Sequence, residues 1–171
     1  MYRTNRVLGN RTAYLVTTSL FSALIFLSIA YILHIPIGNG YVHIGDAFIY
    51  LAAAILPTPY AIACAAIGAG LADLATGYAI WVIPTIIIKP ILVLFITYKG
   101  KKIINTRNVL GAFIGGFVGW FLYALAQGII TGSFISAFVI NLITLLQPIG
   151  SFIVFIILGI TFDKLNLKQK F

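Results

Sequence analysis

Apolar residues fill the chain in long stretches, and short segments with proline, glycine or basic residues separate these stretches. A helix that spans a membrane needs roughly 20 apolar residues, so each long stretch predicts a spanning helix. Pro57 and Pro59 end one stretch early, because proline removes a backbone donor and restricts the residue before it. The segment 131–143 fits either a loop with a short helix or the start of the last span. The pattern predicts six spans, over residues 13–34, 44–56, 60–76, 80–98, 109–130 and 144–162.

The composition agrees with this pattern and limits the class of protein. Of the 171 residues, 61% are hydrophobic and only 8% are charged, whereas about a quarter of a soluble domain is charged. So apolar a surface has to face lipid, and little chain is left for a soluble catalytic or nucleotide-binding domain. We therefore expect one all-α membrane domain over residues 1–171.

Basic residues gather in three clusters at the ends of apolar stretches. The positive-inside rule places all three clusters in the cytoplasm, which an even number of spans allows, so both termini are expected to be cytoplasmic. Because the clusters mark span ends rather than one face, the net charge of +8 indicates membrane anchoring and not nucleic-acid binding. The clusters are Arg3, Arg6 and Arg11; Lys99, Lys101, Lys102 and Arg107; and Lys164, Lys168 and Lys170.

In this topology the strongly polar residues fall near the midplane or in the outer half of the membrane. Charged groups inside membranes are costly and usually mark a pathway or a site. The sequence therefore predicts a polar cavity that opens to the outside above an apolar inner half. The residues that we expect to bind a ligand there are His43, Asp46, Asp73, Trp81, Lys89, Asn141 and Gln147.

Several of these residues also have an ordinary structural explanation. Lys89 lies roughly 6 Å deeper than Asp73 at about 1.5 Å per residue, so the two fit either an ion pair between helices or two ligand contacts. Asp46 suits a helix start at the membrane surface, where a carboxylate favours the helix dipole. Trp81 and the neighbouring Tyr78 fit either an interfacial aromatic belt or stacking on a flat ligand ring.

Other kinds of chemistry have little support. The histidines and aspartates match no metal motif, and Cys64 is the single cysteine, so we expect neither a metal site nor a disulfide. No arrangement of nucleophile and base is evident, so we expect no catalytic residues.

Small residues recur at every fourth position on three predicted spans. Such stripes let helices approach closely, either inside the domain or against another membrane subunit. They comprise Gly111, Gly115 and Gly119; Ala61, Ala65 and Ala69; and the pair Ser19 and Ala23.

The stretch from Gly40 to Pro90 resembles the substrate-binding S components of energy-coupling factor (ECF) vitamin transporters, in particular the branch with candidate hydroxymethylpyrimidine, pyridoxine and riboflavin carriers. The resemblance rests on Tyr41-Val42-His43-Ile44-Gly45-Asp46-Ala47, on Leu71-Ala72-Asp73-Leu74 with Gly77-Tyr78, and on Pro84-Thr85 with Ile88-Lys89.

This resemblance implies a capture protein in the bacterial plasma membrane. Such proteins bind a vitamin from outside, in a pocket under the first loop, and join a transmembrane coupling subunit and two ATPases. The partners use ATP, so this chain is expected to carry no cofactor. The family docks its coupling subunit through an Ala-xxx-Ala motif on the first span, and the matching positions here are Ser19 and Ala23.

Two other classes of function remain open from the residues alone. A self-sufficient small carrier or channel would give flux in liposomes without ATPases. A membrane enzyme or assembly protein would turn over a substrate or bind no small molecule.

Overall fold

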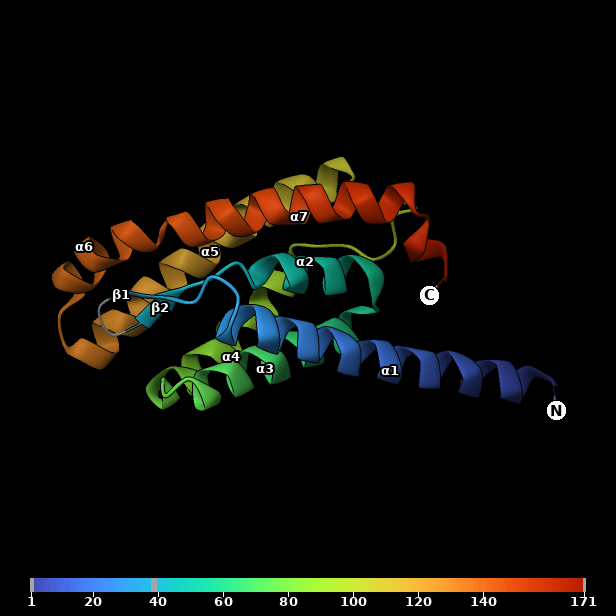
Figure 1. The fold of residues 1–171 in the computed structure, drawn as a ribbon, viewed down its shortest axis with the longest axis horizontal. Coiled ribbons are helices and arrows are strands. Elements are labelled where there is room, and N and C mark those ends of the chain that lie inside the picture. The colour runs from blue at the N-terminus through green and yellow to red at the C-terminus, as the bar shows by residue number, and fades with distance from the viewer. Residues whose placement is uncertain (1, 38–39, 171) are drawn as a thin grey trace.

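The computed structural model describes residues 2–37 and 40–170, with side chains for 11–37 and 40–168. Helices occupy each of the six stretches that hydropathy predicts (Figure 1). The side chains of Arg3, Arg6 and Lys170 lie outside the described residues. The α-helices are α1 (Tyr2–Ala30), α2 (Asp46–Ile55), α3 (Thr58–Ala75), α4 (Val82–Leu94), α5 (Thr106–Thr131), α6 (Phe134–Thr144) and α7 (Leu146–Lys164). Two 3-10 helices, η1 (Ala79–Trp81) and η2 (Leu167–Lys170), and two strands, β1 (Ile35–Ile37) and β2 (Gly40–Val42), complete the described elements.

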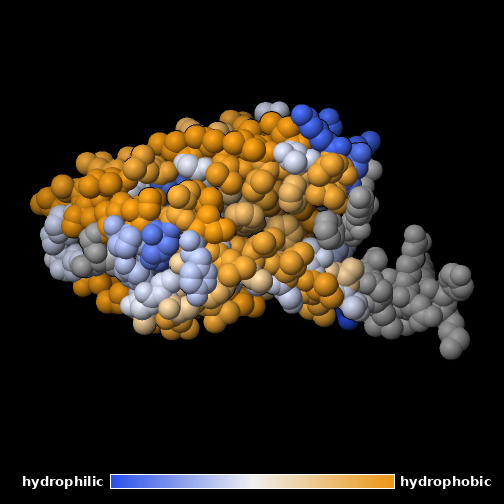
Figure 2. All heavy atoms as spheres, viewed as in Figure 1, coloured by the Kyte–Doolittle hydropathy of each residue, from blue (hydrophilic) through white to orange (hydrophobic). Residues whose placement is uncertain are grey.

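The described helices are those of an all-α membrane protein. Four helical segments are long and apolar enough to cross a bilayer: Arg11–Ala30 of α1, then α3, α5 and the stretch Phe134–Lys164. The segments Asp46–Ile55 and Ala79–Leu94 are apolar but shorter. Orange, apolar atoms cover most of the long side of the molecule in Figure 2, which suits a surface in contact with lipid.

The segment 131–143, which the sequence left open, contains a short helix that leads into the last span. Gly132 ends α5 with a left-handed φ of 69°, a conformation that glycine adopts without strain. Ser133 then caps α6, and its hydroxyl accepts a hydrogen bond from the backbone N–H of Ser136. Only Leu145 separates α6 from α7, so the two form one bent rod along the edge of the molecule (Figure 1).

A small antiparallel hairpin interrupts the helical pattern between α1 and α2. Its register pairs Ile35 with Val42, Pro36 with Tyr41 and Ile37 with Gly40. It lies at the end of the molecule farthest from the chain termini, which we call the hairpin end (Figure 1). The hydropathy pattern predicted only a loop here.

The small-residue stripes lie at helix–helix contacts, as the internal-packing alternative predicted for α3 and α5. Gly68 faces α1 so closely that a Cβ atom would lie 2.6 Å from the carbonyl oxygen of Ser22. A Cβ atom on Gly111 would overlap the carbonyl oxygen of Phe95, just after α4. Ala61 and Ala65 are fully buried in the same core. Glycine and alanine are therefore required here by backbone approach.

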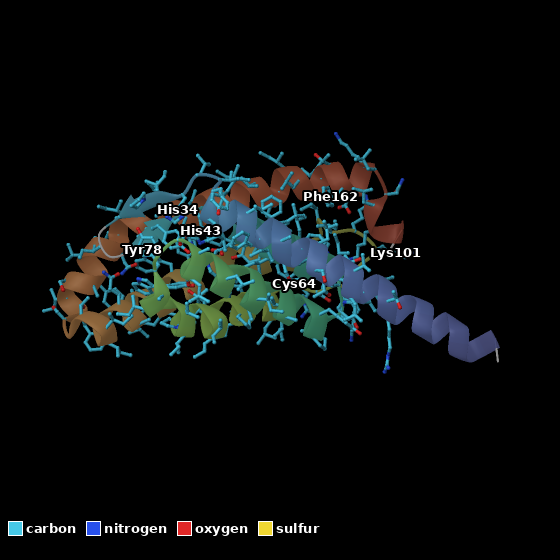
Figure 3. The ribbon with its side chains drawn as sticks, turned by 60° about the horizontal axis from the view of Figure 1, so that its bottom comes forward. His34, His43, Cys64, Tyr78, Lys101 and Phe162 are labelled. Atoms are coloured by element: carbon cyan, nitrogen blue, oxygen red, sulfur yellow. The ribbon has the colours of Figure 1, made fainter. Side chains whose placement is uncertain are left out.

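The opposite end, which we call the basic end, is fixed by polar contacts between α7 and the segment before α5. The Asp163 carboxylate accepts hydrogen bonds from the backbone N–H groups of Ile103 (2.8 Å) and Ile104 (2.9 Å). Figure 3 shows Lys101 and Phe162 at this end, far from His34, His43 and Tyr78 at the hairpin end. Exposed lysines and the two chain termini gather at the basic end, as one side of the membrane requires under the positive-inside rule.

Candidate ligand-binding site

A cavity of about 80 Å³ lies beneath the hairpin, among α2, α3, α4, α5 and the bent rod of α6 and α7. Residues from both halves of the chain line this cavity. All seven side chains that the sequence singled out as ligand contacts line it: His43, Asp46, Asp73, Trp81, Lys89, Asn141 and Gln147.

The deepest polar group of the cavity is an ion pair between α2 and α4. Lys89 Nζ donates to Asp46 Oδ1 at 2.5 Å, and Gln147 Nε2 donates to Asp46 Oδ2 at 3.0 Å. Lys89 is only 2% exposed and Asp46 4%, so both charges are shielded from water. The Tyr123 ring lies 5.0 Å from Lys89 Nζ and adds a cation–π contact.

The structure corrects the helix-to-helix ion pair that the sequence suggested between Asp73 and Lys89. The direct partner of Lys89 is Asp46 on α2. With 10 residues, α2 is about 15 Å long, so it does not cross a roughly 30 Å hydrocarbon core by itself. Asp46 is buried beside Lys89 and Gln147 and is not an exposed residue at a helix end.

Asp46 also does not cap α2, although the sequence offered a capping role as one explanation for this residue. Gly45 holds the N-cap position of α2 and makes no side-chain capping hydrogen bond. Asp46 stands in the first turn, where its charge suits the helix dipole, but both of its oxygens are directed to Lys89 and Gln147.

Asp73 occupies the wall of the cavity that faces the hairpin. The Tyr41 hydroxyl donates to Asp73 Oδ1, and Asp73 Oδ2 has no hydrogen-bond partner among the described residues. Burial, and then the charge of Asp73, raise the pKa of Tyr41 above its ordinary value of about 10. The hydroxyl therefore keeps its proton and remains a donor to Asp73.

His43 is a buried neutral residue between the hairpin and α2. Its Nδ1 accepts a hydrogen bond of 2.9 Å from the backbone N–H of Gly45, which requires that nitrogen to be unprotonated. Burial, and then the positive charge of Lys89, lower the pKa of His43 to about 3. His43 therefore contributes a hydrogen-bonding ring to the cavity but no charge at neutral pH.

An amide cluster forms the wall opposite α3. Asn141 Nδ2 donates to Gln127 Oε1 at 2.6 Å, which joins α6 to α5. Trp120 Nε1 donates to the backbone oxygen of Asn141 at 2.7 Å. The hydroxyl of Thr144 donates to Asn141 as well. These contacts hold amide groups at the edge of the cavity, where they can bind a ligand that has both donors and acceptors.

Aromatic rings complete the lining. Trp81 and Tyr123 lie 5.9 Å apart, and the Tyr41 ring stacks on His34 at 4.1 Å. The sequence reasoning missed Trp120 and Tyr123 as site residues. A signal for them exists, because Gly116, Trp120, Tyr123 and Gln127 recur at intervals of three or four residues and share one face of α5.

Ser19 and Ala23, the positions singled out for a partner interface, lie away from the cavity. Both are exposed and line an open, mostly apolar groove between α1 and α3. Phe26, Leu71 and Leu74 line the same groove. The stripe on α1 thus faces outward, unlike the stripes on α3 and α5. As for metals, the described residues hold no group of three His, Cys, Asp or Glu side chains that could bind one.

Comparison with protein families gives a match over most of the chain. The family model described as "ECF-type riboflavin transporter, S component" matches residues 9–165, which is most of the chain. No curated protein gives a match.

Proposed function

This chain belongs to the ECF-type riboflavin transporter S component family, and from that premise we propose that its vitamin is a compact single-ring nitrogen heterocycle. Membership makes the chain the substrate-binding subunit of an ECF transporter for a vitamin. The proposed ligand is a pyrimidine or pyridine such as hydroxymethylpyrimidine or pyridoxine. It is captured from outside a bacterial plasma membrane.

The size and lining of the cavity carry this proposal. Its volume of about 80 Å³ is well below the roughly 300–1,000 Å³ of pockets for drug-sized ligands. The aromatic rings of Trp81 and Tyr123 suit a flat ring, and the second N–H group of the Gln147 amide suits a ring nitrogen or a hydroxyl group. A ring with one or two hydroxymethyl groups matches both features.

Riboflavin is the second candidate, since the matching family is described by that vitamin. Its three fused rings and its sugar-alcohol chain need more room than the cavity beneath the hairpin offers. Riboflavin would therefore have to displace more of the lining on binding than a single ring would.

Delivery into the cell is proposed to need a transmembrane coupling subunit and two ATPases. The exposed groove along Ser19 and Ala23 supports a docking face on α1, because small side chains let another helix approach closely. The ATPases are proposed to use ATP, and this chain to bind neither ATP nor another cofactor.

Tryptophan fluorescence offers a direct test. The sequence has two tryptophans, and both of them, Trp81 and Trp120, line the cavity. The purified protein in detergent would be titrated with hydroxymethylpyrimidine, pyridoxine, riboflavin and other water-soluble vitamins. We expect saturable quenching at submicromolar concentration by one single-ring compound. The Trp81→Phe and Trp120→Phe variants assign the signal to one wall of the cavity.

Three other outcomes of the binding and flux measurements would change the proposal. Saturation by riboflavin alone would replace the single-ring ligand with the second candidate. No response to any vitamin by folded protein would contradict the proposed site. Flux of the bound vitamin in liposomes that contain this chain alone would favour the self-sufficient carrier and contradict the need for ATPases.

A further inference from the structure

We infer that Asp73 selects the ligand, because its second carboxylate oxygen accepts a hydrogen bond from an N–H or O–H group on the vitamin. This inference rests on the proposed function and deepens it. It defines the substrate class as rings that present a hydrogen-bond donor toward α3 and the hairpin.

The three acidic side chains of the sequence differ in how their oxygens are used. Asp46 accepts from Lys89 with one oxygen and from Gln147 with the other. Asp163 accepts from two backbone N–H groups, one on each oxygen. Asp73 accepts from Tyr41 on Oδ1, while Oδ2 has no partner among the described residues. Asp73 is thus the acidic residue whose second oxygen can accept a further hydrogen bond.

An acceptor in this position is expensive to leave unpaired. Asp73 is 2% exposed, and a buried polar atom without a hydrogen bond destabilises the folded protein, more so when it is charged. Native proteins pair most such atoms, and the exceptions call for an explanation. Asp73 lines the cavity, so a donor on the bound ligand can supply the missing partner.

The hairpin fixes the direction in which Asp73 Oδ2 points. Tyr41 on β2 holds Oδ1, and the Tyr41 ring is itself held by stacking on His34 at 4.1 Å and against Tyr78 at 4.7 Å. The Thr85 hydroxyl also interacts with the Asp73 carboxylate, and it shares a hydrogen bond of 2.9 Å with the Tyr123 hydroxyl in which either group can donate. Tyr41 is therefore a positioning residue for Asp73.

Charge balance in the cavity favours the same class of ligand. Lys89 is in direct contact with Asp46, and the two charges compensate each other. No cation pairs directly with Asp73 among the described residues. A hydrogen bond to a charged acceptor is stronger than one between neutral groups, so an amino or hydroxyl hydrogen on the ring can stabilise this carboxylate.

Methylated ligands and one isosteric variant test this inference. The probes are 4-amino-5-hydroxymethyl-2-methylpyrimidine and two analogues, one with a dimethylamino group and one with an O-methyl ether. If riboflavin is the ligand, its N3-methyl derivative is the probe. We expect one methylated analogue to bind the wild-type protein at least tenfold more weakly than its parent.

The Asp73→Asn variant separates lost hydrogen bonding from steric exclusion by the methyl group. In this variant Oδ1 can still accept from Tyr41, while an NH₂ donor replaces Oδ2. We therefore expect the parent compound to bind at least tenfold more weakly than it binds wild type, and to bind within threefold of its methylated analogue. Thermal unfolding of the variant checks that it is folded.

Two results would overturn the inference while leaving the proposed function intact. The first is binding of every methylated analogue to wild type within threefold of its parent. The second is a methylation penalty of equal size in Asp73→Asn, which would make the effect steric. Failure of wild type to bind any parent vitamin would instead remove the proposed function itself.

Discussion

Lys89 and Asp46 form a buried ion pair, so the contribution of each side chain to stability depends on the presence of the other. Removing one partner of a buried ion pair typically costs about 3–5 kcal/mol, because the remaining charge is left without compensation. Replacing both partners by neutral groups of similar volume costs far less. The pair can therefore be tested as a unit.

We expect Lys89→Met to lower the midpoint of thermal unfolding in detergent and to weaken vitamin binding at least tenfold. The stem of methionine fills the space of the lysine stem, so lost charge is the main change. The Lys89→Met/Asp46→Asn double variant is the control. It should recover most of the thermal stability and none of the binding. Equal unfolding midpoints for wild type and Lys89→Met would show that the pair is unimportant for stability.

His43 gives the stability a defined dependence on pH. Its pKa of about 3 in the folded protein lies below the ordinary value of 6.5, so the unfolded chain binds a proton that the folded protein excludes. This contribution is complete above about pH 6.5 and is lost as the pH falls toward 3. Between pH 7 and pH 5 the loss is about 2 kcal/mol.

The measurement is the midpoint of thermal unfolding at pH 7 and at pH 5, for wild type and for His43→Asn. The asparagine oxygen can accept the Gly45 N–H bond that His43 Nδ1 accepts, and it does not titrate in this range. The wild type should lose more stability than the variant on acidification. An identical loss in both proteins would assign the pH dependence to other groups.

At the scale of elements, the contact between α4 and α5 includes a close backbone approach at Gly111. A Cβ atom on Gly111 would overlap the carbonyl oxygen of Phe95, which is backbone and cannot rotate away. Gly150 on α7 is a matched control, since a Cβ atom there meets Ile44 at an ordinary 3.8 Å. Both glycines lie inside helices, so helix propensity acts equally on them.

We expect Gly111→Ala to lower the free energy of unfolding by about 2 kcal/mol or more, because overpacking forces the helices apart. Gly150→Ala should keep or raise stability by up to about 1 kcal/mol, since alanine favours the helix. Thermal unfolding of both variants in the same detergent makes the comparison. Equal stabilities would mean that α5 can shift without cost.

Hydropathy predicted the helices well because lipid imposes a length and an apolar composition on each one. It failed where that constraint does not apply. The strands β1 and β2 have three residues each, too short to show an alternating pattern. The pairing of Asp46 with Lys89 also escaped prediction, since it depends on how α2 packs against α4. Such packing leaves no periodic signal in the sequence.

For the molecule as a whole, the site and the proposed docking groove lie in different places. The cavity is lined by α2 to α7, the hairpin and Ile29 near the end of α1, while the groove of Ser19 and Ala23 lies between α1 and α3 and shares no residue with it. The polar site residues could be collected from the sequence because polar groups are rare in these helices. Their pairing could not, since it depends on side-chain reach across elements distant in the chain.

This separation predicts that binding and uptake can be uncoupled. We expect Ser19→Trp to leave vitamin affinity within threefold of wild type and to abolish uptake by cells that contain the complete transporter. Leu20→Trp is the control, because Leu20 is 55% exposed and does not line the groove. It should leave both properties unchanged. Normal uptake with Ser19→Trp would remove α1 from the docking face.

Because acidic residues are few, chemical labelling of carboxylates can report when the cavity opens. Of its three acidic side chains, Asp46 and Asp73 are buried and Asp163 is partly exposed at the basic end. A carbodiimide reagent therefore reaches Asp163 directly, but it reaches Asp73 only if the lining of the cavity moves. Covalent labelling of Asp73 would record the moments when Tyr41 has released it and the hairpin has moved. The rate of that labelling, with and without vitamin, would time the opening of the entrance in a chain that carries no engineered probe.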